Sequence, residues 1–230
     1  MSRAISPERQ LAAQEYFSLL RDQALVAGEQ GNYAISAALV VRAGGTELVA
    51  VGANTVFGSR DPSGHAEMNA IRLAREFAAT RRPMDAHGLC ENTSSGSIAL
   101  RRAPHSERET VLFTTLEPCP MCTVCIITAG IKRVVIAAAD PPSGSLAPER
   151  LRDLPPLWSE LADALGLEVS FCQSENPEQA DTYLSAALHK ELIETFLASR
   201  ERLDRALGSD GVLDLDAIGK RAATLADESL

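Results

Sequence analysis

The sequence predicts an α/β protein, in which a three-layer α/β/α arrangement encloses a five-stranded mixed sheet. Apolar segments of strand length alternate along the chain with segments that have a helical period. Hydrophobic residues make up 45% of the 230 residues, which is enough for a buried core. Aromatic residues make up only 4%, so we expect a core built mainly from aliphatic side chains.

The first elements are a helix, a pair of strands and a second helix. A Ser-Pro-Glu sequence typical of a helix start and a stop at Gly28 predict a helix over residues 6–27. Residues 34–56 then favour two strands joined at a Gly-Gly turn. Residues 61–79 enter a helix from a turn-forming Asp-Pro-Ser-Gly sequence.

Residues 81–109 show no sustained period. They contain two Arg-Arg pairs and two prolines, and we interpret them as a long loop inserted into the domain. The arginine pairs suit a solvated loop face, and contact with a phosphate is the alternative.

The second half of the chain resumes the alternation. In order, we expect strand 110–116, helix 118–129, strand 132–140, a helix at 149–165 interrupted by two prolines, strand 167–172 and helix 181–207. The tail at 208–230 is acidic and weakly patterned. We therefore divide the chain into a domain at 1–166, with an insertion at 81–109, and an extension at 167–230 that is a candidate lid or dimer element.

The charge and the termini limit the classes of function. A formal net charge of −9 argues against non-specific binding to nucleic acid, although it leaves room for a local basic groove. No apolar run reaches the roughly 18 residues of a membrane span, and the N-terminal residues lack the apolar stretch of a signal peptide. We expect a cytoplasmic protein whose thiols are reduced.

Two strand-to-helix junctions contain the unusual residues. One holds His65 and Glu67, and the other holds Cys119 and Cys122. A helix N-terminus favours the thiolate form of a cysteine, and thiolate is the form that binds metal. One imidazole and two thiolates supply three ligands for zinc and leave a fourth position for water, whose pKa zinc lowers towards about 7. Glu67 follows the candidate histidine ligand closely in the sequence, so its carboxylate could take a proton from the zinc-bound water and deliver it onward.

The cysteines also allow other interpretations. A CxxC pair alone is typical of a redox dithiol or of half a structural zinc site. Cys125 extends the pair to CxxCxxC, which allows an iron–sulfur scaffold, but we favour a packing role for it. Cys90 and Cys172 are expected to be inert.

The motif HAE, followed by PCPMC, resembles the zinc-dependent cytidine-deaminase-like superfamily, for which H-x-E…P-C-x-x-C is a general signature. The resemblance covers about residues 35–145 and includes GANTV, DPSGHAEMNAIR, TTLEPCPMC and AGIKRVVIAAADP. It implies one zinc ion per subunit, held by His65, Cys119 and Cys122. It also implies that Glu67 is the proton shuttle, that Asn54 hydrogen-bonds the substrate, and that the protein is a homodimer.

The resemblance leaves the substrate open. DPSGHAEMNAIR and TTLEPCPMC are similar to bacterial guanine deaminases and tRNA adenosine deaminases, whereas HAEMNAI with IITAGIKRVV is also similar to deoxycytidylate deaminases. We rank a free nucleobase or nucleoside first, with guanine as the best guess, then a pyrimidine (cytosine, cytidine or deoxycytidylate), then a tRNA adenosine. A catalytically silent, zinc-stabilised binding scaffold is the alternative from another class.

Overall fold

The computed structural model describes residues 7–80, 90–93, 96–102, 108–172 and 184–207. Its elements, in chain order, are α1 (Pro7–Glu29), β1 (Ser36–Ala43), β2 (Thr46–Ala53), α2 (Val56–Ser59), α3 (Ala66–Thr80), β3 (Cys90–Thr93), β4 (Gly96–Arg102), β5 (Glu109–Leu116), α4 (Pro120–Thr128), β6 (Arg133–Ala138), α5 (Pro148–Leu151), α6 (Pro156–Leu165), β7 (Glu168–Phe171) and α7 (Ala186–Leu207).

The strands form one mixed sheet, in the order β3-β4-β2-β1-β5-β6-β7. β1 pairs antiparallel with β2 and with β5. β5, β6 and β7 run parallel to one another, so their carboxyl ends lie at the same edge of the sheet. The helices that link parallel strands must cross over a face of the sheet. The α/β fold class predicted from the sequence is confirmed.

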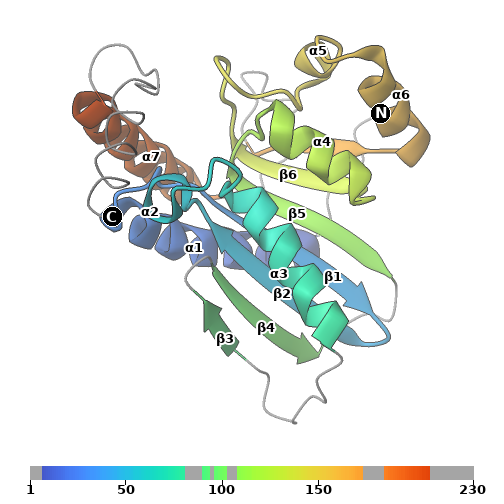
Figure 1. The fold of residues 1–230 in the computed structure, drawn as a ribbon. Coiled ribbons are helices and arrows are strands. Elements are labelled where there is room, and N and C mark those ends of the chain that lie inside the picture. The colour runs from blue at the N-terminus through green and yellow to red at the C-terminus, as the bar shows by residue number, and fades with distance from the viewer. Residues whose placement is uncertain (1–6, 81–89, 94–95, 103–107, 173–183, 208–230) are drawn as a thin grey trace, which may run out of the picture.

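Helices cover both faces of the sheet, which gives three layers (Figure 1). α1 and α7 pack on one face, over a core that includes Phe17, Val40, Phe113 and Leu188. α3 and α4 lie on the other face, over a mainly aliphatic core that includes Ile126. Because side chains alternate along a strand, neighbouring residues of β1 and β5 contribute to opposite layers.

The predicted number of five strands was wrong, because the described residues form a sheet of seven strands. The two additional strands, β3 and β4, come from the 81–109 segment that we interpreted as a loop. β4 pairs antiparallel with β2, and β3 pairs with β4. The apolar residues of this segment are few and are interrupted by polar ones, so its sequence shows no strand period. The pairing of β4 with β2 is what makes it part of the sheet.

Several boundaries also differ from the prediction. α4 begins at Pro120, so Cys119 is its N-cap residue and lies just outside the helix. The interruption at the two prolines is confirmed, because α5 and α6 are separate helices. The short helix α2, directly after β2, was not predicted. Within the described residues, no helix has the length and hydropathy needed to cross a bilayer.

Candidate active site

The two strand-to-helix junctions meet and bring the three predicted metal ligands together. His65 immediately precedes α3, Cys119 caps α4, and Cys122 lies in the first turn of α4. His65 Nδ1 is 3.6 Å from Cys119 Sγ and 3.5 Å from Cys122 Sγ. Within the described part of the chain, this is the one group of three or more His, Cys, Asp or Glu side chains close enough to share a metal ion.

This donor set fits zinc. Its three ligand atoms lie within 4.8 Å of one another, so small rotations bring them to a common ion. Zinc in proteins binds thiolate sulfur and imidazole nitrogen, and three protein ligands leave one tetrahedral position for water or substrate. His65 and Cys119 are partly exposed and Cys122 is buried, so the cluster is partly accessible to solvent.

Glu67 points into this cluster from the first turn of α3. Its Oε2 accepts a hydrogen bond from Cys122 Sγ at 3.4 Å, and its Oε1 accepts one from Thr114 Oγ1 at 3.2 Å. The Thr114 hydroxyl also lies 2.9 Å from the carbonyl oxygen of Leu116. Both carboxylate oxygens of this buried side chain therefore have fixed partners from β5 and α4.

The site shifts the ionisation of its own groups. Burial raises the pKa of Glu67, so its protonated form is more stable than that of an exposed glutamate. The hydrogen bond from Cys122 is the main cause that lowers the pKa of Cys119 to about 4, and the contact with His65 contributes. The pKa of Cys122 is raised, because its interaction with the Cys119 sulfur and the burial of its side chain both favour the protonated form.

Asn69, which the sequence analysis missed, fixes the loop that leads into His65. Its side-chain amide donates to Ala53 O at 2.8 Å and to Thr55 Oγ1 at 3.1 Å, and it approaches Gly64 O at 3.4 Å. Its backbone N–H donates to His65 O at 2.9 Å. The signal in the sequence was a polar residue on the otherwise apolar face of the helix.

Asn54, the predicted substrate ligand, lies in the same junction. It follows the last residue of β2 and is buried. Its backbone N–H donates to Ile35 O at 2.9 Å, and its side-chain Oδ1 accepts the Val56 N–H at 3.3 Å. Because Asn69 binds the residues on either side of it, Asn54 is held beside the loop that presents His65. Its role towards substrate stays a prediction.

Cys125 packs against the core beneath α3 and α4, as the sequence analysis favoured over an iron–sulfur ligand. Cys172 is buried in the core under α1 and α7. The side chain of Cys90 is outside the described part of the structure.

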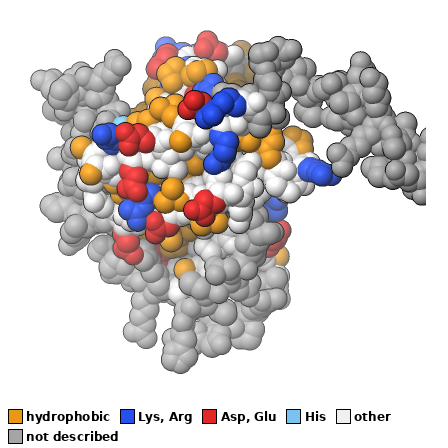
Figure 2. All heavy atoms as spheres, turned by 90° about the vertical axis from the view of Figure 1, so that its left-hand side faces the viewer, with side chains coloured by type: hydrophobic (Ala, Val, Ile, Leu, Met, Phe, Trp, Pro, Cys, Tyr) orange, Lys and Arg blue, Asp and Glu red, His pale blue; other side chains and the backbone are white. Residues whose placement is uncertain are grey.

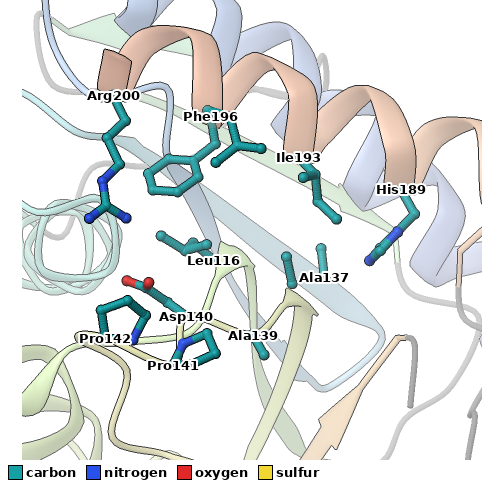
Figure 3. A pocket seen from close by; sticks show the side chains of 12 residues that line it. Leu116, Ala137, Ala139, Asp140, Pro141, Pro142, His189, Ile193, Phe196 and Arg200 are labelled. Carbon is teal, nitrogen blue, oxygen red and sulfur yellow. The ribbon is translucent and has the colours of Figure 1, made fainter. Parts of the chain in front are cut away.

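A cavity of about 430 Å³ lies between α7 and the carboxyl ends of β5 and β6, and none of its lining residues belongs to the metal cluster (Figure 3). Asp140 and Pro142 form its floor, and Phe196 and Arg200 of α7 point into it from above. The full lining is Leu116, Ala137, Ala138, Ala139, Asp140, Pro141, Pro142, His189, Ile193, Phe196, Leu197 and Arg200.

The cavity lining and the metal cluster consist of different residues. Leu116 lines the cavity, and Cys119 follows three residues later. The carboxyl edge of parallel strands is where α/β proteins bind ligands. A volume of this size falls within the range of small-molecule pockets, about 300–1,000 Å³.

The chain is similar in sequence or structure to several deaminases. A curated relative, the tRNA-specific adenosine deaminase of Agrobacterium fabrum, is 27% identical over 161 residues, which cover 67% of this chain and 88% of the relative. A solved structure of guanine deaminase from Nitrosomonas europaea is 22% identical, covers 85% of this chain and 87% of its own, and has a TM-score of 0.46. A dCMP deaminase from the cyanophage S-TIM5 is 18% identical, covers 73% and 99%, and has a TM-score of 0.35.

The family comparison covers more than half of the chain and includes every residue of the cluster. The pattern of the cytidine and deoxycytidylate deaminase zinc-binding region matches residues 12–138. Together with the His65, Cys119 and Cys122 cluster, this match shows that the chain belongs to the zinc-dependent cytidine and deoxycytidylate deaminase family.

Proposed function

We propose that this zinc-dependent deaminase acts on a free nucleobase or nucleoside, and that guanine is its first candidate substrate. Hydrolysis of the amidine group of guanine consumes one water and gives xanthine and ammonia. The observation that supports hydrolysis most directly is the buried Glu67 carboxylate, held against the His65, Cys119 and Cys122 cluster.

The residues of the site have separate tasks in this reaction. His65, Cys119 and Cys122 would hold the zinc ion, which activates water by lowering its pKa towards about 7. Burial raises the pKa of Glu67, which favours its role in taking up a proton and delivering it to the ring nitrogen and to the leaving amine. Thr114 fixes the orientation of that carboxyl group.

The preference for a small substrate rests on the charge of the protein. Acidic and basic side chains are interspersed over the described residues of the face in Figure 2, and the net charge is −9. A protein that binds the phosphate backbone of a tRNA needs a concentrated positive surface.

A tRNA adenosine is the second candidate, because the curated Agrobacterium relative is a tRNA-specific adenosine deaminase. A pyrimidine base, nucleoside or nucleotide is the third. The homodimer, the cytoplasmic location and the lid role of residues 167–230 also stay predictions.

The first test is ammonia release by the zinc-loaded protein from guanine, adenine, cytosine, their nucleosides, deoxycytidylate and an anticodon stem-loop. We expect turnover of guanine. Turnover of the stem-loop or of a pyrimidine, but not of guanine, would contradict the proposed substrate.

The Glu67→Gln variant tests catalysis itself. Since an amide cannot shuttle the proton, we expect kcat to fall by about 10²–10⁴-fold while the zinc content is unchanged. Glu76→Gln, an exposed glutamate on the same helix, is the matched control. Equal turnover by Glu67→Gln and wild type would exclude the role proposed for Glu67.

A further inference from the structure

Glu117 is a buried carboxylate for which the proposed reaction has no use. It lies between β5 and the zinc ligand Cys119, and its side chain is fully buried. Its Oε1 accepts hydrogen bonds from the Leu146 and Ala147 N–H groups, both at 3.0 Å, and from Arg150 Nε at 3.1 Å. Its Oε2 accepts the Asp140 N–H at 3.2 Å and Arg150 Nη2.

These five bonds wrap the 139–147 loop around a single side chain. Three donors are backbone groups of the loop, and the other two come from the guanidinium of Arg150 in α5. Gly144 packs directly on the carboxylate, since a Cβ placed there would lie 2.4 Å from Glu117 Cδ. The arginine neutralises the charge, and its fork matches the two carboxylate oxygens.

The 139–147 loop then makes hydrogen bonds to residues on both sides of Cys119. The Ser145 N–H donates to Pro118 O at 2.9 Å, one residue before the ligand. The hydroxyl of Ser145 is 2.8 Å from the hydroxyl of Thr123, whose own N–H donates to Cys119 O at 2.9 Å. Pro118 and Pro120 restrict the backbone on either side of the ligand. The position of Cys119 therefore depends on the position of the loop.

We propose that Glu117 and Arg150 are a positioning pair for the metal site: they hold the 139–147 loop in the one arrangement in which Ser145 fixes Cys119 as a zinc ligand. The pair acts through the loop and does not touch the ligand. The inference depends on the zinc site on which the proposed function also rests, but it requires no particular substrate.

The test measures zinc affinity by competition with a chromophoric chelator, alongside the free energy of unfolding in urea. Removal of a group that orients a metal ligand typically weakens metal binding by about 10–100-fold. We expect Arg150→Ala to raise the zinc dissociation constant within that range. Arg150→Lys should recover part of the zinc affinity, because the lysine ammonium restores the positive charge but cannot bond both carboxylate oxygens of Glu117 as the guanidinium does.

Two controls separate positioning from general destabilisation. Arg152→Ala removes an exposed arginine from the same segment and should leave zinc affinity unchanged. Glu109→Gln weakens ion pairs at the opposite end of β5, so it should lower stability without changing zinc affinity. If Arg150→Ala fails to fold, Gly144→Ala displaces the same loop and should weaken zinc binding.

The proposal is overturned if Arg150→Ala, or Gly144→Ala in its place, binds zinc as tightly as wild type. It is also overturned if the variant loses no more affinity than Glu109→Gln at an equal loss of stability. Because zinc binding is measured without substrate, an inactive wild type would contradict the proposed function and leave this result valid.

Discussion

Glu67 and Asn69 lie two positions apart on α3 and serve different ends. The Glu67 carboxylate faces the metal ligands and accepts hydrogen bonds from Thr114 Oγ1 and Cys122 Sγ. The Asn69 amide turns to the backbone at the end of β2 and to Thr55. One helical turn therefore carries the group proposed for proton transfer and the group that holds the preceding loop in place.

Replacing Asn69 by alanine tests that second role. The change leaves Ala53 O and Thr55 Oγ1 without their buried donor, and we expect a loss of about 1–3 kcal/mol in the free energy of unfolding. Urea denaturation measures it. Ser18→Ala, which removes a hydroxyl that donates to Gln14 O in an exposed turn of α1, should change little. Equal stability of Asn69→Ala and wild type would show that these bonds contribute nothing net.

His189 is expected to make stability depend on pH. Burial lowers the pKa of His189 below its ordinary 6.5, although a hydrogen bond to the Ala137 backbone opposes the shift. As pH falls, the unfolded chain binds this proton first, so the contribution to stability is complete above about 6.5 and is lost as pH falls through the lowered pKa.

The His189→Gln variant should therefore lose less stability than wild type on acidification from pH ~7.5 to ~5. Urea unfolding across that range, with both proteins loaded with zinc, gives the comparison. Parallel curves for the two proteins would rule out this contribution of His189.

At the residue scale, the sequence was sufficient where chemistry depends on local spacing. His65 and Glu67 lie in one short motif, and Cys119 and Cys122 lie in another, so the ligand set could be predicted before the fold was known. Thr114, Asn69 and Glu117 could not be found in this way. Their partners are backbone atoms and side chains that become neighbours only after folding, such as the Leu146 N–H, 29 positions from Glu117.

At the scale of elements, β2 and α3 are in direct backbone contact at Gly52. A Cβ on Gly52 would lie 2.2 Å from Ala66 O and 2.4 Å from Ala70 N. Ala66 stands between His65 and Glu67, so this contact fixes the depth at which the first turn of α3 lies over the sheet. The position of two site residues depends on the absence of one methyl group.

The Gly52→Ala variant should displace that turn. We expect it to lose about 1–3 kcal/mol of stability from overpacking and to bind zinc more weakly. Gly28→Ala, whose methyl group would meet Ala34 Cβ at 3.3 Å, is a milder control. Urea denaturation and chelator competition give the two values. Unchanged zinc affinity in Gly52→Ala would show that α3 can shift without moving His65.

The elements that the sequence predicted well are those with strong apolar periodicity. α1, β1, β2, α3 and β5 all lie close to their expected ranges. β4 was missed because part of what makes it a strand is its pairing with β2, which no local pattern shows. The start of α4 was placed two residues early, since Pro118 and Pro120 are both acceptable at a helix start.

At the scale of the whole molecule, one network of charges connects five strands at the end of the sheet away from the site. Glu109 of β5 binds Arg42 of β1 and Arg133 of β6, each at 2.7 Å. Arg42 reaches Glu47 of β2 at 2.5 Å, and Arg133 reaches Glu168 of β7 at 3.2 Å. The central members are only 16–27% exposed, so water screens them less than surface pairs.

Replacing Glu109 by glutamine should lower the free energy of unfolding by about 1–3 kcal/mol, because two arginines lose their shared carboxylate. The loss should be smaller at high salt. Glu194→Gln, which breaks the exposed Lys190–Glu194 pair on α7, should change stability by less than about 1 kcal/mol. Urea unfolding at low and high salt makes the comparison. Equal losses for the two variants would contradict a cooperative role for the network.

The layered α/β/α plan followed from the alternation of strands and helices, but the width of the sheet did not. The chain order of the strands also differs from their order in space, because β1 lies between β2 and β5. Such an arrangement is set by long-range pairing and by the crossover of helices, which are properties of the complete chain.

The metal ligands come from two points of the chain, and His65 and Cys119 are 54 positions apart. A zinc ion bound to both is therefore a cross-link that closes a loop containing α3, the β3–β4 hairpin and β5. Closing such a loop removes freedom from the unfolded chain more than from the folded one. Removing the zinc with a chelator should therefore lower the thermal stability of the protein as well as stop its reaction, because metal binding contributes to the free energy of folding.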